Sequence, residues 1–179
     1  LPAVLNAAES LRHKNAIRWL IVGDGRRSVW FHEEVARRGL QSNVLLLGRF
    51  PVERMPSFYA HADALLVSLK KDPVFSLTIP GKVQSYLMAG VPILGMLDGE
   101  GAQVITDSNA GLVCAAGNSG GLASAVLEMF AMSVDQRKQL SVNGRDYAQK
   151  EFGRGLLMDQ LEVLLHEAVD LHRQVKMAA

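Results

Sequence analysis

A short stretch in the middle of the chain, "TIPGKVQSYLMAGVPIL" at residues 78–94, combines residue types that could bind an anion. Pro80, Gly81 and Lys82 stand directly before an apolar helical run. The N-terminus of a helix leaves backbone N–H groups unpaired and carries about half a positive charge. Gly81 would let a ligand approach the backbone, and Lys82 adds a full positive charge. The stretch predicts a phosphate or diphosphate site; the alternative is an ordinary helix start with Lys82 in solvent.

Glycines and lysines follow two other apolar runs of the chain. Gly23 and Gly25 come directly after the run at residues 17–22, where they form either a tight turn or one wall of a ligand site. Lys70 and Lys71 follow the run at residues 63–69. These two cations either help to neutralise the proposed diphosphate or are simply solvated.

Acidic residues and the single cysteine predict no metal site. Asp98, Glu100 and Asp107 lack the spacing of a calcium-binding loop, and we expect Asp98 or Glu100 to cap a helix. Cys114 lies in the apolar run "GLVCAA", which indicates a core position, and one cysteine excludes an internal disulfide.

The elements that must hold these residues alternate between strands and helices. Strands are predicted at residues 17–22, 43–48, 63–69, 91–96 and 110–115. Helices are predicted at residues 2–13, 27–39, 51–62, 80–89, 100–109, 119–132, 133–152 and 154–176, with residues 70–78 as a loop. Unbroken Val, Leu and Ile runs, each followed by a helix, indicate a Rossmann-like α/β fold: a parallel sheet flanked by helices. Ligands of such sheets bind beyond the carboxyl ends of the strands, where the glycines and lysines above are found.

Length and charge narrow the class of protein. The 179 residues fit one domain. With 19 basic and 18 acidic side chains the chain lacks the field that would draw in nucleic acid or an anionic bilayer. No apolar run is long enough to span a membrane, and no signal sequence is recognisable, so we expect a cytoplasmic protein. The chain begins without Met inside a helical pattern, and we therefore expect it to be a piece of a longer protein.

Four segments together resemble a known family. They are "WLIVGDG", "NVLLLGRFPVERMPSFYAHADALLVSL", "IPGKVQSYLMAGVPIL" and "GAQVITDSNAGLVCAAGNSGGLASAVLEM". In order and spacing they are similar to the C-terminal, donor-binding half of the family 4 glycosyltransferases, retaining enzymes with two Rossmann-like domains in the GT-B arrangement. The resemblance implies that residues 1–179 form this C-terminal domain. It also implies that the domain's first strand and the N-terminal acceptor domain lie before Leu1.

The chain departs from the family at two positions. Many members carry two glutamates eight positions apart, and the aligned residues here are Leu77 and Ser85. The wording "IPGKVQSYLMAG" resembles a subgroup, involved in bacterial surface polysaccharide assembly, that lacks this pair. A ribose hydroxyl would then be bound by the neutral side chain of Ser85 or Gln84.

The resemblance also implies a substrate and a site. The donor would be a nucleotide-diphosphate sugar, a UDP-sugar, bound without cofactor or metal, and the reaction a hexosyl transfer to a saccharide or lipid-linked acceptor. Lys82 would be the catalytic residue, because it would stabilise the charge that grows on the leaving diphosphate. The loop of Gly48, Arg49 and Phe50 would lie by the base, unless Arg49 is only a surface charge. The donor-binding residues implied are Gly23, Gly25, Arg49, Phe50, Lys70, Thr78, Pro80, Gly81, Lys82, Val83, Gln84 and Ser85.

Two other functions fit the same residues. A UDP-sugar 2-epimerase shares the two-domain architecture, but it would need more carboxylates and histidines in its cleft than these loops offer. A noncatalytic nucleotide-binding module would explain Leu77 and Ser85 as signs of lost activity. If the protein is a glycosyltransferase, it would be cytoplasmic or peripheral at the inner face of the membrane, through the missing domain. The isolated chain would then be inactive.

Overall fold

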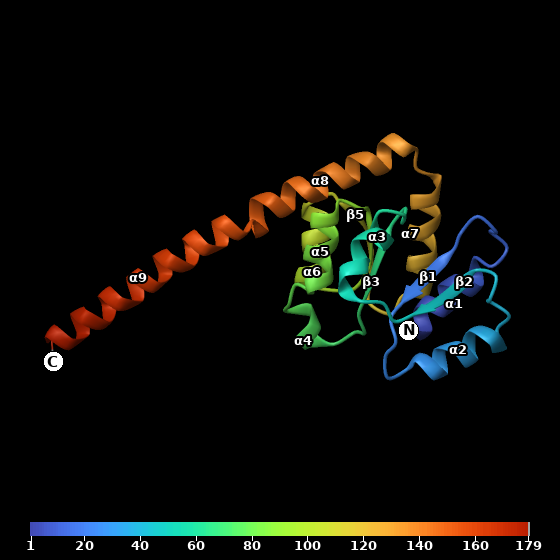
Figure 1. The fold of residues 1–179 in the computed structure, drawn as a ribbon, viewed down its shortest axis with the longest axis horizontal. Coiled ribbons are helices and arrows are strands. Elements are labelled where there is room, and N and C mark those ends of the chain that lie inside the picture. Colours follow the sequence, from blue (N-terminus) through green and yellow to red (C-terminus); the bar gives the residue numbers. More distant parts are fainter. Residues whose placement is uncertain (179) are drawn as a thin grey trace.

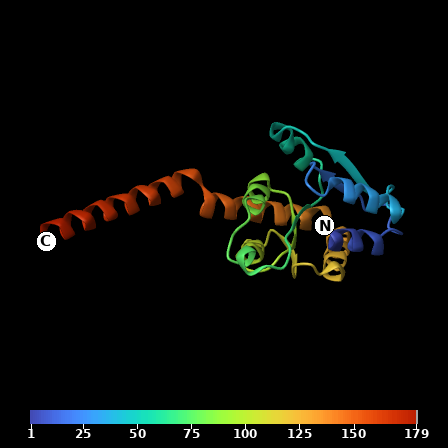
Figure 2. The ribbon, with the colours of Figure 1, turned by 90° about the horizontal axis from the view of Figure 1, so that it is seen from below.

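The chain folds as parallel strands flanked by helices, which confirms the predicted α/β class. The computed structural model describes residues 1–178, and the side chains of residues 1–169. In the described part, each strand is followed by at least one helix, with α4 and α5 both between β3 and β4, and two long helices follow α7 (Figure 1). The last helix points away from the rest of the molecule in both views (Figures 1 and 2).

The strands form two parallel sheets. They are β1 (Trp19–Val22), β2 (Val44–Gly48), β3 (Leu65–Ser68), β4 (Ile93–Met96) and β5 (Gly111–Cys114). β1 pairs with β2, and the second sheet has the order β3-β4-β5. All lie within the predicted segments. β4, which has a strand on each side, is buried at every position, as its unbroken apolar sequence requires.

The helices connect and cover these strands. Their bounds are α1 (Pro2–Ser10), α2 (Ser28–Arg37), α3 (Met55–Tyr59), α4 (Pro73–Ser76), α5 (Gly81–Ala89), α6 (Glu100–Asp107), α7 (Ser119–Ala131), α8 (Val134–Phe152) and α9 (Arg154–Ala178), with a 3-10 turn at Val52–Arg54. α8 begins with a capping box, in which Ser133 accepts from the Gln136 N–H and the Gln136 side chain accepts from the Ser133 N–H.

The prediction that residues 70–78 form only a loop was wrong, because they contain α4. Asp72 caps this short helix by accepting a hydrogen bond of 3.1 Å from the Val74 N–H. Pro73 occupies the first helical position, where its missing N–H costs nothing. The pair Asp-Pro is thus a helix-start signal that the sequence contained.

Two apolar clusters hold the layers together. One lies under α1, α2, α7 and strands from both sheets, and includes Leu5, Trp19, Leu94 and Leu122. The other surrounds α5 and α6 against β3 to β5. Because α1 packs on α7, a single helix layer supports both sheets.

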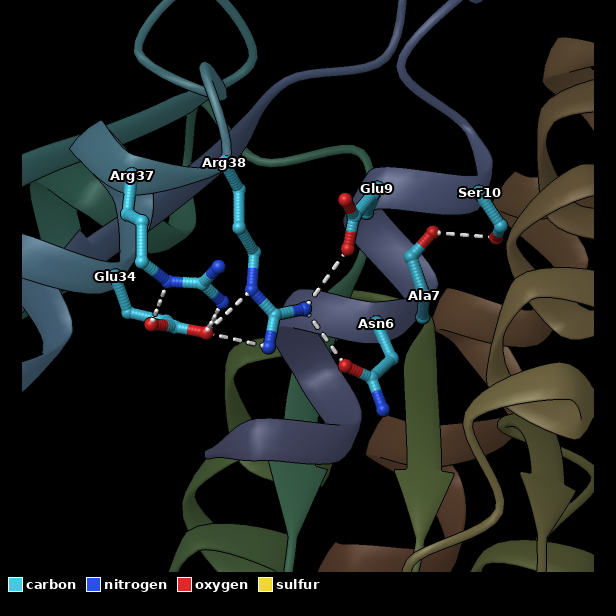
Figure 3. A network of polar contacts seen from close by, with 7 residues as sticks. All are labelled: Asn6, Ala7, Glu9, Ser10, Glu34, Arg37 and Arg38. Carbon is cyan, nitrogen blue, oxygen red and sulfur yellow. Dashed lines mark hydrogen bonds and ion pairs between the residues drawn. The ribbon is translucent and has the colours of Figure 1, made fainter.

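A polar network fastens α1 to α2 (Figure 3). Arg38 donates to Asn6 at 2.7 Å, to Glu9 at 2.9 Å and to Glu34 at 2.6 Å. Arg37 also donates to Glu34, at 2.6 and 2.9 Å. Hydrogen bonds from Arg37 first, and then from Arg38, lower the pKa of the Glu34 carboxyl to about 2. Glu34 therefore keeps its negative charge well below neutral pH.

Candidate functional site

The N-terminus of α5 is open, as an anion site requires. Pro80 precedes the helix in an extended conformation, and no side chain within residues 1–169 caps it. The Val83 N–H donates to the Pro80 carbonyl at 2.8 Å. A Cβ added to Gly81 would meet no described atom within 4 Å. The absence of a side chain at Gly81 is therefore not required by packing within this chain, and it leaves free space beside the backbone donors.

Lys82 supplies a cation at the same place. It is exposed, and it forms no ion pair with any acidic group whose side chain is described. The next residue, Val83, is fully buried in the apolar core. Val83 thus anchors the helix and can offer a ligand only its backbone, while Lys82 remains available in solvent.

Lys70 is already engaged inside its own loop. Its Nζ lies 2.9 Å from Asp72 Oδ2 and 5.6 Å from the ring centroid of Phe75. The hydrogen bond from Lys70, followed by that from the Val74 N–H, lowers the pKa of the Asp72 carboxyl. Lys70 helps to organise the start of α4. Its contact with a nucleotide-sugar remains a prediction.

Two glycines pack the neighbouring helices against the α5 N-terminus. Gly99 precedes α6 with φ +71°, and a Cβ there would collide with the backbone carbonyl of Ser76 in α4. A Cβ at Gly101 would lie 2.7 Å from Pro80 Cδ. Any side chain would push these elements apart. The beginnings of α5 and α6 therefore form one compact surface with α4.

The prediction that Asp98 or Glu100 caps a helix was wrong, because Glu100 is the first residue of α6 and neither carboxylate caps it. The residue before this helix is Gly99, and no side chain in the described part of the chain caps it. Asp98 Oδ1 instead accepts a hydrogen bond of 3.0 Å from the Ala116 N–H. Asp98 thus ties the loop after β4 to the loop after β5, a long-range contact that no local sequence signal indicates.

The glycines and Arg49 lie at the ends of the other sheet. The Gly23 N–H donates to the Gly48 carbonyl at 2.7 Å, and both residues have positive φ, +133° and +73°. A Cβ at Gly23, Gly25 or Gly48 would meet nothing within 4 Å. The positive φ at Gly23 and Gly48 favours glycine at these two positions. All three glycines leave space open beside the backbone. Arg49 is exposed.

Aromatic contacts hold the loop that follows Arg49. Phe50 stacks edge-on against Phe58 of α3, with ring centroids 4.9 Å apart. No hydrogen bond or ion pair among the described residues joins this loop to the α5 N-terminus. The predicted residues therefore fall into two groups, one at the carboxyl end of each sheet.

The remaining predicted residues point their hydroxyls at their own backbone. Thr78 Oγ1 donates to the Phe75 carbonyl at 3.3 Å, and Ser85 Oγ donates to the Gly81 carbonyl at 2.8 Å. Gln84 is half-buried. Ser85 also lines a groove that the sequence did not indicate.

This groove, of about 630 Å³, lies along the C-terminal half of α5. Its lining includes Tyr59, Gly90, Pro92 and Arg145. Pro92 directly precedes β4, so the groove opens toward the amino ends of the strands, away from the α5 N-terminus. It results from the packing of α3, α5 and α8, which residue spacing alone could not reveal.

Two general features complete the description of the site. In the part of the chain that the structure describes, no group of three or more His, Cys, Asp or Glu side chains could hold a metal ion. Within the same residues, no helix has the length and apolar character needed to cross a bilayer.

The family follows from a comparison with known proteins. The family model described as "Glycosyl transferases group 1" matches residues 1–132, about three quarters of the chain. The chain belongs to this family of glycosyltransferases. No curated protein matches it.

Solved structures of similar fold include glycosyltransferases. HepE from Anabaena, solved in complex with UDP, has a TM-score of 0.78 at 16% identity, over 92% of this chain and 44% of HepE. WaaG, a glycosyltransferase involved in lipopolysaccharide biosynthesis, has a TM-score of 0.68 at 22% identity, over 89% of this chain and 41% of WaaG. The C-terminal domain of LpcC from Francisella tularensis has a TM-score of 0.67 at 18% identity, over 85% of this chain and 78% of that domain.

These matches confirm the GT-B glycosyltransferase resemblance. The chain spans less than half the length of HepE and WaaG, and most of the LpcC C-terminal domain. Its fold is therefore that of one half, the C-terminal one, of such an enzyme.

Proposed function

We propose that this chain binds the UDP-sugar donor of a retaining hexosyltransferase. The observation that carries the proposal is the uncapped N-terminus of α5, with open space over Gly81 and the exposed Lys82 beside it. Membership of a glycosyltransferase family and the similarity to HepE, which was solved with UDP, support a nucleotide-sugar as the ligand.

The charge of this helix end suits the chemistry of transfer. When the sugar leaves, negative charge grows on the diphosphate oxygen that it leaves behind. The free N–H groups at the start of α5 and the ammonium of Lys82 would stabilise that charge, and they are already in place before the reaction. Positive charge at the diphosphate is then supplied by the chain itself, so transfer would proceed without a metal ion.

The open glycines of the other sheet suit the nucleoside end of the donor. Gly23 and Gly25 leave room for a ligand to approach the backbone, and Arg49 with Phe50 follows the neighbouring strand. In this proposal the base lies beside the loop at Gly48. The ribose is bound by Gln84, or by Ser85 once its hydroxyl gives up the hydrogen bond to the Gly81 carbonyl.

The acceptor, a saccharide or a lipid-linked sugar of a bacterial surface polysaccharide, would be bound by another domain of the protein. The chain corresponds to less than half of HepE and WaaG, which supports this division of labour. The isolated chain would accordingly bind UDP weakly and transfer little sugar.

Titration of the chain with UDP, followed by amide NMR shifts, tests the proposal. We expect the signals of residues 78–86 and of Gly23 and Gly25 to move, while those in the middle of α8 stay in place. Uridine, which has the base and ribose but no phosphate, is the matched control and should leave residues 80–83 unmoved. If UDP leaves residues 78–86 unmoved, the site assignment is wrong.

A further inference from the structure

Glu100 is a charged residue beside the α5 N-terminus that has no part in binding the diphosphate. It is the first residue of α6, it is exposed, and it caps no helix. Its carboxylate forms no ion pair with any cationic group whose side chain is described. The acidic residues of the neighbouring loops are both engaged, Asp72 by Lys70 and Asp98 by a backbone N–H. Among the described side chains of this region, Glu100 thus provides the carboxylate that remains available to a ligand.

Packing holds the backbone of Glu100 beside the segment that leads into α5. The helices α5 and α6 lie side by side (Figure 1). A Cβ at Gly99, directly before Glu100, would collide with the Ser76 carbonyl. A Cβ at Gly101, directly after it, would lie 2.7 Å from Pro80 Cδ. Both neighbours of Glu100 therefore contact the stretch of chain that ends at the α5 N-terminus.

The side chain of Glu100 begins on the side of the sheet at which the donor would bind. α5 ends just before β4 and α6 begins just after it, so both helices begin at the carboxyl edge of the strands. The Cα–Cβ bonds of a helix tilt toward its N-terminus, so that of Glu100 points beyond the start of α6. The sugar of the donor is joined directly to the diphosphate, and it would therefore lie next to the α5 N-terminus. Glu100 stands beside that place.

A free carboxylate in this position disfavours a phosphate but suits a sugar. Negative charge near a diphosphate repels it and opposes the attraction that α5 and Lys82 provide. Sugar hydroxyls are donors, and their hydrogen bonds to a charged acceptor are stronger than those to a neutral one.

The segment just before α5 provides no charged acceptor of its own. The hydroxyls of Ser76 and Thr78 donate to carbonyls of α4, at 2.7 and 3.3 Å. Leu77, between them, is apolar and 77% exposed. A sugar at this end of α5 would therefore find its strong acceptor on α6, at Glu100.

We propose that Glu100 is a specificity-determining residue for the transferred sugar. Its carboxylate accepts hydrogen bonds from two adjacent hydroxyls of the sugar, while Lys82 and the α5 N-terminus hold the diphosphate. This inference rests on the proposed function. The two oxygens of a carboxylate can accept from two hydroxyls at once, so the donors that fit are UDP-sugars with a free vicinal diol facing α6.

Binding of UDP and of UDP-sugars to Glu100→Gln tests the proposal. Calorimetry on the chain of residues 1–179 gives the ratio of the Kd for UDP to the Kd for UDP-glucose, UDP-galactose, UDP-N-acetylglucosamine and UDP-N-acetylgalactosamine. The variant should bind UDP at least as tightly as the unaltered chain does, because the repulsion is gone. For the sugar with the highest ratio in the unaltered chain, the ratio should fall by about fivefold or more.

Asp107→Asn is the matched control, because it removes the same charge from the last residue of α6. It should leave every ratio unchanged. Amide chemical shifts of α6 report whether each variant is folded. If Glu100→Gln is unfolded, the same ratios are measured with Glu100→Asp, whose shorter side chain should also lower the ratio.

A carboxylate that only stabilises the start of α6 would give a different result. Glu100→Gln would then be less stable, and the ratio would stay within twofold for all four sugars, which would overturn the proposal. UDP binding with unchanged ratios overturns this proposal alone. Absence of UDP binding by the unaltered chain would overturn the proposed function as well.

Discussion

The two ends of α5 differ in whether other groups of the protein cap their free backbone groups. At the N-terminus none of the described side chains caps the helix, and a Cβ at Gly81 would meet none of the described atoms within 4 Å. At the C-terminus Gly90 takes φ +62°, and its N–H donates to the Leu87 and Tyr86 carbonyls at 2.9 and 3.1 Å. Arg145 of α8 then donates to the Ala89 carbonyl at 3.3 Å.

The C-terminus of α5 is thus held by the protein itself, whereas its N-terminus is available to a ligand. The free carbonyls at the end of a helix need partners, and at the C-terminus the protein supplies them itself. The free donors at the N-terminus are left to solvent or to a ligand. Between the two ends, Val83 and Leu87 are fully buried, so the open end is held rigidly in spite of having no cap.

The largest expected effect is at the open end. Lys82→Gln should weaken UDP binding by about tenfold or more, because a hydrogen bond to a charged group contributes about 1.5–3 kcal/mol. Isothermal titration calorimetry measures the change. Lys138→Gln on the exposed surface of α8 removes the same charge and should leave the affinity unchanged. Equal losses in both variants would indicate a general charge effect and would argue against a site at α5.

At the closed end, Gly90→Ala should lower the free energy of unfolding. A residue with a Cβ costs about 1–2 kcal/mol in the left-handed conformation, and this Cβ would also displace the guanidinium of Arg145. Urea denaturation measures the loss. A stability equal to that of the unaltered chain would mean that the C-terminal cap is not as tight as the contacts indicate.

The buried half of α5 should also be sensitive to alkaline pH. Burial, and then the neighbouring Tyr59, raise the pKa of the Tyr86 hydroxyl to about 12. Between about pH 10 and 12 the unfolded tyrosine loses its proton while the native one keeps it, so stability falls over this range. Tyr86→Phe should lack this part of the loss, and its stability relative to the unaltered chain should rise from pH 9 to 11.5. Parallel pH curves from urea denaturation would contradict the assignment.

The smallest change in stability is expected for Gly81→Ala. With open space around this position, alanine should raise the free energy of unfolding by up to about 1 kcal/mol, the opposite sign to Gly90→Ala. The same methyl group should nevertheless weaken UDP binding, since it stands where the diphosphate would approach. Thermal denaturation and calorimetry on this one variant separate the two effects. A variant that is both more stable and equally able to bind UDP would show that Gly81 does not contact the ligand.

Strands and helix starts could be predicted from the sequence, because residues close together in the chain determine them. The apolar runs predicted every strand segment, and Pro80-Gly81-Lys82 marked the start of α5. The capping box at Ser133 and the Asp-Pro start of α4 were equally local, although α4 was missed. In these cases the residues that make the hydrogen bond are two or three positions apart.

Other features of the site depend on contacts between residues far apart in the chain, and sequence patterns could not predict them. Asp98 bonds the Ala116 N–H, 18 positions away, and Arg145 reaches the end of α5 from another helix. The closeness of Gly99 to Ser76, and the open space over Gly81, likewise depend on how three helices pack.

The sequence by itself determined which segments become strands and helices and where the positive helix end lies, because periodicity and turn residues act over a few positions. Only the tertiary structure decided which end of α5 is capped and which of the predicted lysines forms an ion pair. These depend on segments that meet across the fold, and a linear pattern carries no information about which of them will touch.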